Sequence, residues 1–264
     1  MAADVSQGRS TAAPRTSSPG AERLAALIRE SETVVALTGA GISVPSGIPD
    51  FRSPGTGLWQ KVDPMEVAHI DAFRGDPVRF WSFYGERFAT LRDRRPNRAH
   101  LALAELERRG ELAAVITQNV DMLHRRAGTR ELVEVHGSIE HAGCPACGQR
   151  FPLDQAQARR DDDVQGVPRC DCGEALKPGV VLFGELLPAQ ALARAEELAE
   201  SADLLVCVGS SLEVYPVASL PFTTRAAGGR VALVTRSSTP VDHIAELKLD
   251  GDVVDELDAV LSAL

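Results

Sequence analysis

Residues 34–52 read Val34-Val-Ala-Leu-Thr-Gly-Ala-Gly-Ile-Ser-Val-Pro-Ser-Gly-Ile-Pro-Asp-Phe-Arg52, an apolar run followed by a glycine turn and a proline-broken loop. Glycines at 39 and 41 allow the backbone to approach a pyrophosphate, and a helix that starts after them would supply N–H donors. Val44 occupies the third glycine position of the dinucleotide fingerprint, and the segment after Phe51 does not continue as a βαβ unit. The stretch therefore predicts a bound dinucleotide that undergoes chemistry other than hydride transfer.

Short apolar runs rich in β-branched residues recur along the chain and predict strands that are buried on both faces. These runs are 34–37, 114–117, 132–135, 180–183, 204–208 and 231–234. Helical patterns lie between most of them, at 97–109, 188–200 and 217–227, and a last one closes the chain at 252–264. Strands and helices that alternate in this way predict an α/β fold with a doubly wound, mostly parallel sheet.

Three segments depart from this alternation. Residues 1–20 are rich in Ala, Ser, Thr, Pro and Gly and are interpreted as a disordered tail, which leaves 21–264 as the folded domain. The first insertion, 54–95, carries many aromatic residues and predicts a few short helices. The second insertion, 138–178, carries four of the five cysteines.

Composition limits the possible partners of the chain. With 264 residues and 44% hydrophobic content, it can bury a full core. The net charge of −9 opposes nonspecific nucleic-acid binding and fits basic partners such as lysine-bearing protein tails. The sequence has neither a secretory apolar region nor an apolar run long enough to span a bilayer. We therefore expect a cytoplasmic monomer with no membrane partner.

Two close cysteine pairs, Cys144-Pro-Ala-Cys147 and Cys170-Asp-Cys172, have the layout of a tetrahedral zinc ribbon. The second pair is C-x-C where C-x-x-C is more usual, so His141 is a reserve ligand. Four ligands leave no open position for catalysis, which predicts one structural Zn²⁺ per chain. Four reduced thiols or a redox pair are the alternative. Cys207 lies within an apolar run and is interpreted as a buried strand residue.

Polar residues follow two of the predicted strands. Thr117-Gln118-Asn119-Val120-Asp121 follows one run, and His136-Gly137 follows another, so both reach the carboxyl edge of the sheet where open α/β folds bind ligands. A histidine there can act as a general base near neutral pH. The alternative is a histidine whose hydrogen bonds are satisfied by the backbone at a domain joint.

These motifs, together with Phe183-Gly184-Glu185 and Gly209-Ser210-Ser211, resemble those of the sirtuin family, the NAD-dependent protein-lysine deacylases. The resemblance runs from about Leu24 to Leu264. It implies a Rossmann-like large domain and a small domain made of a zinc module and a helical module. NAD and the acyl-lysine peptide would then enter the cleft between the two domains from opposite sides, and the products would be nicotinamide, free lysine and acyl-ADP-ribose.

The resemblance also implies roles for individual residues. His136 would deprotonate a ribose hydroxyl, and Asn119 would be the second catalytic residue. Phe51 would shield the reactive face from water. Residues 180–185 would pair with the substrate backbone by strand addition, and those named as substrate contacts are Val180, Phe183, Gly184 and Glu185. Contacts to NAD would come from Gly39, Ala40, Gly41, Ile48, Asp50, Phe51, Arg52, Gln118, Asn119, Val120, Asp121, Gly209, Ser210, Ser211, Thr235 and Val253. Thr235 stands where many members carry Asn.

Tyr84 and Arg87 are three residues apart on a predicted helix and can face one pocket. The pair resembles the Tyr-x-x-Arg of sirtuins that prefer succinyl, malonyl or glutaryl lysine, because a guanidinium binds a carboxylate through two hydrogen bonds. Ala68 resembles the small residue that leaves room for such chains. The alternative is a packing aromatic residue and a solvated arginine. The sequence leaves open whether acetyl-lysine or an acidic acyl-lysine is preferred.

Two other functions use the same motifs. Mono-ADP-ribosyl transfer would use the same activated C1′ with a different acceptor and would leave ADP-ribose on protein. A noncatalytic NAD-sensing module that binds partners would release no deacylated product.

Overall fold

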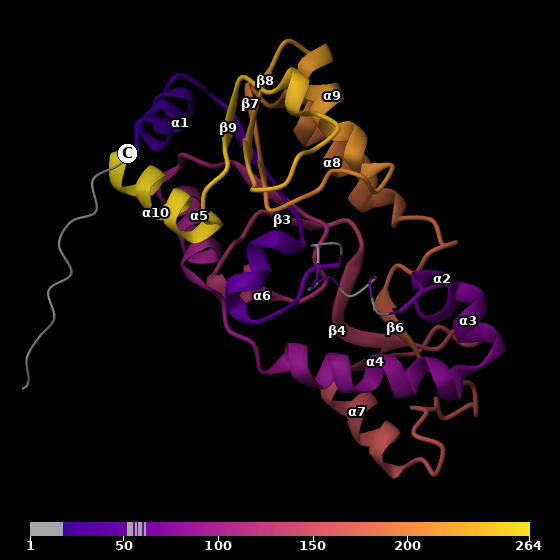
Figure 1. The fold of residues 1–264 in the computed structure, drawn as a ribbon. Helices are drawn as coiled ribbons and strands as arrows, with labels where there is room; N and C mark the ends of the chain where they lie inside the picture. Colours follow the sequence, from indigo (N-terminus) through magenta and orange to yellow (C-terminus); the bar gives the residue numbers. More distant parts are fainter. Residues whose placement is uncertain (1–17, 52–54, 56, 58–59, 61) are drawn as a thin grey trace, which may run out of the picture.

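A six-stranded parallel sheet forms the centre of the large domain, in the order β3-β2-β1-β7-β8-β9. The computed structural model describes residues 18–51, 55, 57, 60 and 62–264 (Figure 1). The strands are β1 Val34–Thr38, β2 Ala114–Thr117, β3 Leu132–Glu134, β7 Leu204–Val208, β8 Arg230–Val234 and β9 Leu247–Leu249. The strand order reverses between β1 and β7, and open sheets bind ligands at the carboxyl ends of strands that meet at such a point.

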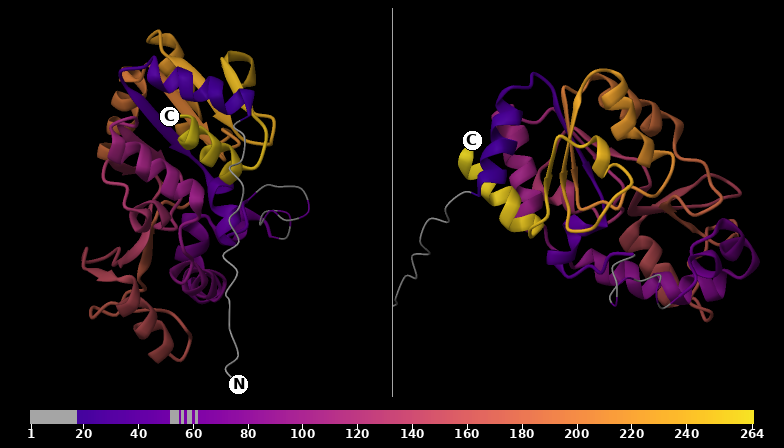
Figure 2. Two further views of the ribbon diagram at one scale, coloured as in Figure 1. Left: turned by 90° about the vertical axis from the view of Figure 1, so that its left-hand side faces the viewer. Right: turned by 45° about the horizontal axis from the view of Figure 1, so that its top comes forward.

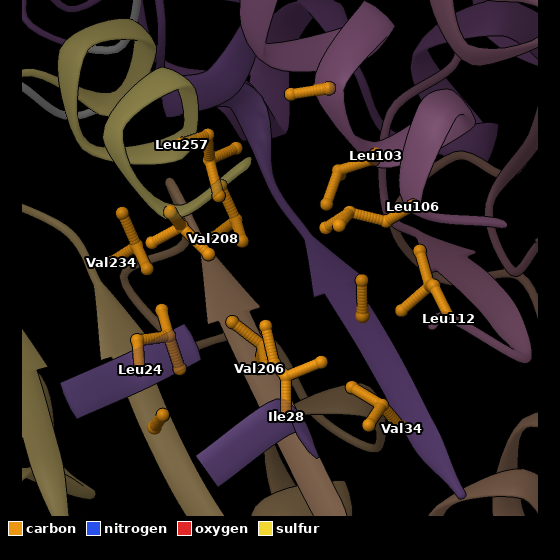
Figure 3. Packing of buried hydrophobic residues seen from close by; sticks show 14 of the residues in the cluster. Leu24, Ile28, Val34, Leu103, Leu106, Leu112, Val206, Val208, Val234 and Leu257 are labelled. Atoms are coloured by element: carbon orange, nitrogen blue, oxygen red, sulfur yellow. The ribbon is translucent and has the colours of Figure 1, made fainter. Parts of the chain in front are cut away.

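Helices cover both faces of this sheet (Figure 1, Figure 2). Successive side chains of β1 alternate between the two layers, so Val34 packs in one cluster and Val35 in the other. One layer holds α1 Pro19–Arg29, α5 Arg98–Arg109 and α10 Val253–Ala263, and the other holds α8 Ala189–Ser201 and α9 Leu220–Ala226. Figure 3 shows the first layer, with labelled side chains Leu24, Ile28, Val34, Leu103, Leu106, Leu112, Val206, Val208, Val234 and Leu257. The predicted doubly wound fold is confirmed.

Helix α1 begins inside the segment expected to be a tail. Ser18 caps the helix by accepting a hydrogen bond from the N–H of Ala21, at 3.1 Å, and proline occupies the first helical position. Both features favour a helix start. The remainder of the expected tail, residues 1–17, lies outside the described residues.

The small domain combines the two insertions around one core (Figure 1). A three-stranded antiparallel sheet has the order β5-β4-β6, and Trp81 of α4 donates from Nε1 to the carbonyl oxygen of Leu176, at 2.9 Å. The elements are α2 Pro64–Val67, α3 Ile70–Gly75, α4 Pro77–Arg92, β4 Gly137–Gly143, β5 Arg150–Pro152, α7 Leu153–Asp162 and β6 Lys177–Val180. The aromatic insertion is thus the helical module, and the cysteine insertion carries this small sheet.

The prediction that residues 180–183 form a strand of the large sheet is wrong. Val180 ends β6 of the small sheet, and its side chain and that of Leu182 pack in the small-domain core. The following backbone pairs elsewhere, because the Phe183 N–H donates to the carbonyl of Ala68 at 2.9 Å. Val180 and Leu182 are buried, but Phe183 is 37% exposed, so the run is not buried along its whole length as expected. The burial of two apolar residues does not identify the sheet to which they belong.

Shorter elements in the described part of the chain include the helix α6 Leu123–Ala127 and the 3₁₀ helices Ala40–Ser46, Val217–Ser219 and Asp242–Ile244. Across the described part of the chain, none of the helices has both the length and the apolar character needed to cross a bilayer.

Candidate active site

The glycine turn after β1 lies directly against the loop after β7. The N–H of Gly41 donates to the carbonyl of Gly209 at 2.7 Å. A Cβ atom on Gly39 would lie 2.8 Å from the Cα of Ser210, and one on Gly41 would lie 2.7 Å from the Gly209 oxygen. Only glycine fits at these two positions, and the turn therefore holds bare backbone at the strand-order reversal. This arrangement fits a pyrophosphate.

Two cavities open beside this turn. The sheet-edge cavity, of about 680 Å³, lies among the ends of β1, β7 and β8 and the start of α10. The inter-domain cavity, of about 320 Å³, lies between the segments that follow β2 and β3 and the helix α4. Residues that line both are Ala40, Phe51, Gln118, Asn119, His136 and Val214. The side chains named for catalysis are thus at the junction of the cavities.

All residues predicted to act in catalysis or to bind cofactor or substrate line one or both cavities, except Arg52, which lies outside the described residues. Those on the sheet-edge cavity alone are Gly39, Gly41, Asp50, Gly209, Ser210, Ser211, Thr235 and Val253. Those on the inter-domain cavity alone are Ile48, Ala68, Tyr84, Arg87, Val120, Asp121, Val180, Phe183, Gly184 and Glu185. Residues from distant parts of the sequence therefore meet around one junction.

His136 has one ring nitrogen engaged and one available. Its Nδ1 lies 2.9 Å from the carbonyl oxygen of Gln118. Because a carbonyl can only accept, Nδ1 carries the proton, and Nε2 keeps a lone pair. Burial lowers the pKa of His136, and the bond to Gln118 opposes this in part. The ring is therefore a neutral base at the cavity junction.

Asn119 is anchored by its backbone and by its amide nitrogen. Its N–H donates to Thr117 Oγ1 at 3.1 Å. Its Nδ2 donates to the carbonyl of Gly39 at 3.0 Å and to Ser43 Oγ at 3.2 Å. With the nitrogen held in this way, the amide oxygen of Asn119 is the atom with which it can accept a hydrogen bond from a ligand hydroxyl.

Asp121 is buried beside Asn119. Its Oδ2 accepts from Ser43 Oγ at 2.6 Å, and its Oδ1 accepts from the N–H of Leu123 at 2.9 Å. Burial raises the pKa of Asp121, and these hydrogen bonds oppose that shift. A carboxyl group held in this way presents a fixed polar wall to a ligand amide.

Tyr84 and Arg87 form the wall of the inter-domain cavity on the small domain. Tyr84 is buried between Phe80 and Phe88, at centroid distances of 4.7 and 5.1 Å, and burial raises its pKa to about 12. Arg87 is half-buried, and burial lowers its pKa. Ala68, 4% exposed, completes the wall.

The backbone of residues 181–183 is already paired within the protein. The N–H groups of Val181 and Phe183 donate to the carbonyls of His136 and Ala68, at 2.8 and 2.9 Å. The N–H of Leu182 donates to the carboxylate of Glu185 at 2.8 Å. These three N–H groups are therefore not available for strand addition by a substrate.

Four thiols gather at the tip of the small domain. The sulfurs of Cys144, Cys147, Cys170 and Cys172 lie within 4.8 Å of one another. The pairs Cys144–Cys172 and Cys147–Cys170 are each separated by 3.5 Å. Tetrahedral zinc with bonds of about 2.3 Å holds sulfurs about 3.8 Å apart, so the donor set fits the metal. The His141 ring contacts Arg150, and the four cysteines form a complete set of zinc ligands without it.

Several residues around the site were not foreseen. Ser43 bridges Asn119 and Asp121, and Tyr215 lines the inter-domain cavity with 68% of its surface exposed. Arg236 lines the sheet-edge cavity and pairs with Asp252 at 3.0 Å. Ser43 stands within the glycine stretch, but its contacts with Asn119 and Asp121 appear only in the folded chain, as do the positions of Tyr215 and Arg236 on the cavities.

The chain resembles known proteins over most of its length. Residues 39–216 match the profile of the Sir2 family. A protein named NAD-dependent protein deacetylase from Caldivirga maquilingensis is 44% identical over 244 residues, or 92% of this chain and 93% of that protein. NAD-dependent protein deacylase 1 from Archaeoglobus fulgidus is 43% identical over 89% of this chain and 96% of its own length. The solved complex of Sir2 with a p53 peptide and NAD+ has a TM-score of 0.84 and 41% identity, and covers 91% of this chain and 96% of that one.

Proposed function

Because the chain belongs to the Sir2 family and is an NAD-dependent protein deacylase, we propose that His136 is its general base at the junction of the two cavities. The observation that carries this proposal is the hydrogen bond from His136 Nδ1 to the carbonyl of Gln118, at 2.9 Å, which leaves Nε2 able to accept a proton. The same ring lines both cavities. It can therefore reach a ribose hydroxyl from one side and an acyl group from the other.

In this proposal NAD binds in the sheet-edge cavity and reaches the junction. The bare backbone of Gly39 and Gly41 holds the phosphates, and the amide oxygen of Asn119 accepts from a ribose hydroxyl. Asp121, just inside the inter-domain cavity, holds the carboxamide of the nicotinamide. When bound, NAD supplies an electrophilic C1′ and nicotinamide as leaving group.

In the proton transfer, this chain contributes His136, a base whose ring is held in a fixed orientation. His136 takes the proton at Nε2, and the Gln118 carbonyl, bound to Nδ1–H, stabilises the imidazolium that results. Burial keeps the ring neutral before the step. Phe51 lies at the same junction and excludes water from it.

The acyl-lysine enters the inter-domain cavity, and we propose that an acyl group with a terminal carboxylate is accepted there. The Arg87 guanidinium is partly removed from water, which lowers its pKa and strengthens its attraction for an anion. Tyr84 Oη can donate a second hydrogen bond, because its raised pKa keeps it protonated. Acetyl-lysine, which is smaller, fits the same space.

The cysteine cluster is proposed to hold one structural Zn²⁺ that fastens the cysteine insertion and takes no part in the chemistry. The four thiols need a reducing compartment to stay free for a metal, which supports a cytoplasmic location. A monomer completes the proposal, and light scattering of the purified protein tests it.

The test of the proposed function is a product analysis. The zinc-loaded protein is incubated with NAD and acetyl-, succinyl- and malonyl-lysine versions of one peptide, and nicotinamide, free-lysine peptide and acyl-ADP-ribose are measured. All three products in equal amounts support deacylation. ADP-ribose retained on protein would instead support mono-ADP-ribosyl transfer, and an unchanged cofactor would support the noncatalytic module.

A further inference from the structure

A buried chain of three side chains runs beneath the anchor of Asn119. Thr38 ends β1, Thr117 ends β2 and His124 lies on α6, and none of them is more than 2% exposed. None of the three lines the sheet-edge or the inter-domain cavity. The reaction proposed above gives no role to them, although polar groups buried so deeply carry a desolvation cost.

The three side chains are linked by short hydrogen bonds. His124 Nε2 lies 2.9 Å from Thr38 Oγ1, and Thr38 Oγ1 donates to Thr117 Oγ1 at 2.8 Å. Thr117 Oγ1 in turn accepts the N–H of Asn119 at 3.1 Å. The chain connects α6 to the backbone of a residue at the junction of the cavities.

The chemistry of the groups fixes the direction of this chain. A threonine hydroxyl has one proton, and since Thr38 gives it to Thr117, the hydroxyl can only accept from His124. His124 must therefore be the neutral tautomer with the proton on Nε2. Its Nδ1, which has no partner among the described residues, is then a bare acceptor and not an unpaired N–H donor.

Burial and the neighbouring ring keep His124 in this state. Burial lowers the pKa of His124 to about 3, and His100, 4.9 Å away between ring centroids, adds to that shift. The neighbouring ring is in turn linked to the buried carboxyl group, because Ser43 Oγ lies 3.4 Å from His100 Nε2 and donates to Asp121 Oδ2. His124 is therefore neutral near neutral pH.

We propose that His124 is a positioning residue for the reaction, acting through Thr38 and Thr117 to hold the Asn119 backbone at the junction of the cavities. The inference rests on the proposed function, in which Asn119 accepts from a ribose hydroxyl. With the Thr117 hydroxyl oriented by its neighbours, its lone pair faces the Asn119 N–H. Without them the hydroxyl can rotate, and the loop that carries Asn119 loses a fixed anchor.

The experiment compares Thr38→Val, which has the same shape without a hydroxyl, with Thr38→Ser, which keeps the hydroxyl. We expect Thr38→Val to lower kcat about tenfold while KM for the acyl peptide stays within about twofold, because one oriented hydrogen bond is lost without change to the peptide cavity. Thr38→Ser restores most of kcat. We expect the kcat of His124→Leu to fall as far as that of Thr38→Val, and the kcat of His124→Gln to fall less. The Thr38→Val/His124→Leu double variant should have a kcat no lower than that of the slower single variant, because both substitutions break the same chain of hydrogen bonds.

The matched control is Thr224→Val, which removes another fully buried hydroxyl, one that donates to the Ala199 carbonyl at 2.7 Å on the far side of the sheet. It should leave kcat unchanged. The inference is overturned if the kcat of Thr38→Val is within twofold of the parental value, or if the kcat of Thr224→Val falls as far as that of Thr38→Val.

A second measurement does not depend on turnover. Amide hydrogen exchange of Asn119 should be slow in the parent and in Thr38→Ser, and at least about tenfold faster in Thr38→Val. Equal protection in all three proteins would overturn the positioning role. Absence of NAD consumption by the parent would instead refute the proposed function, and the exchange rates would still decide the role of the chain.

Discussion

The guanidinium carbon of Arg87 lies over the ring of Phe51, 5.3 Å from its centroid. Arg87 belongs to helix α4 of the small domain, whereas Phe51 belongs to the loop that follows the glycine turn of the large domain. Phe51 lines both cavities, and Arg87 lines only the inter-domain cavity. The group proposed to recognise an acyl carboxylate therefore touches the residue proposed to shield the reaction from water.

Substitution of Arg87 tests the acyl preference. Arg87→Met keeps the length of the side chain and removes its charge, so we expect kcat/KM for succinyl-lysine peptide to fall about 10- to 100-fold, since a charge-assisted contact is lost from a partly buried site. The value for acetyl-lysine peptide should change by less than about threefold. Steady-state kinetics on the two peptides give the ratio of kcat/KM for succinyl-lysine to kcat/KM for acetyl-lysine.

Arg79→Met is the control on the same helix. Arg79 is 61% exposed and pairs with Glu66, away from both cavities. It should leave the ratio of the two rates unaltered. An Arg87→Met enzyme with the parental ratio would show that the arginine has no part in acyl selection.

The role of His136 predicts both a loss of activity and the shape of a pH profile. His136→Ala should lower kcat by about 10²- to 10⁴-fold, with NAD and peptide still bound. The base must be neutral to act, and burial lowers its pKa below the usual value of about 6.5. The acid limb of the kcat profile should accordingly fall below pH 6.5, and activity should be constant just above it. An acid limb at or above pH 7 would contradict this account.

The glycine turn predicts a defect in binding of the cofactor. Gly41→Ala places a methyl group against the Gly209 backbone, at 2.7 Å from its oxygen, which must displace one of the two loops. We expect KM for NAD to rise at least about tenfold, because the phosphate site is distorted. Gly75→Ala, where a Cβ would have no atom within 4 Å, is the control and should bind NAD as the parent does. Equal NAD affinity in both variants would refute the assignment of the turn.

The cysteine cluster predicts a stoichiometric metal. The parent should contain one zinc per chain by mass spectrometry or atomic absorption, and Cys170→Ala should lose it and melt at a lower temperature. Cys207→Ala removes a thiol buried in β7, outside the cluster, and should keep its zinc. Retention of a full equivalent by Cys170→Ala would be inconsistent with a four-cysteine site.

The periodic parts of the fold could be predicted from sequence because each depends on local burial. The apolar run before Gly39 is β1, and the helix expected at 97–109 is α5, which Asn97 caps. The prediction failed where burial is shared between domains. Val180 and Leu182 are as apolar as a strand of the large sheet, yet they belong to the small-domain core. Strand β9, Leu247–Leu249, carries Lys248 at its centre, so no apolar run marks it in the sequence.

The candidate site could be predicted where residues stand next to one another in a motif. Asn119 and His136 follow strands, and strand ends meet at one edge of a parallel sheet, so their proximity was foreseeable. The hydrogen bonds that support these residues could not be predicted. Thr38 and His124 are 86 residues apart in sequence, and only the folded chain brings them to 2.9 Å. His124 follows Asp121 by three residues, so the sequence places it on a helix that supports this loop, but its threonine partner cannot be read from the sequence.

The central claim is that His136 acts as the base of an NAD-dependent deacylation at the junction of the two cavities. The most direct measurement is the formation of acyl-ADP-ribose from NAD and acetyl- or succinyl-lysine peptide, by the parent and by His136→Ala, at matched zinc content. The account predicts one acyl-ADP-ribose per nicotinamide released by the parent, and a loss of about 10²-fold or more in the variant. A parent that leaves NAD intact with every acyl peptide, or a variant as fast as the parent, would contradict it.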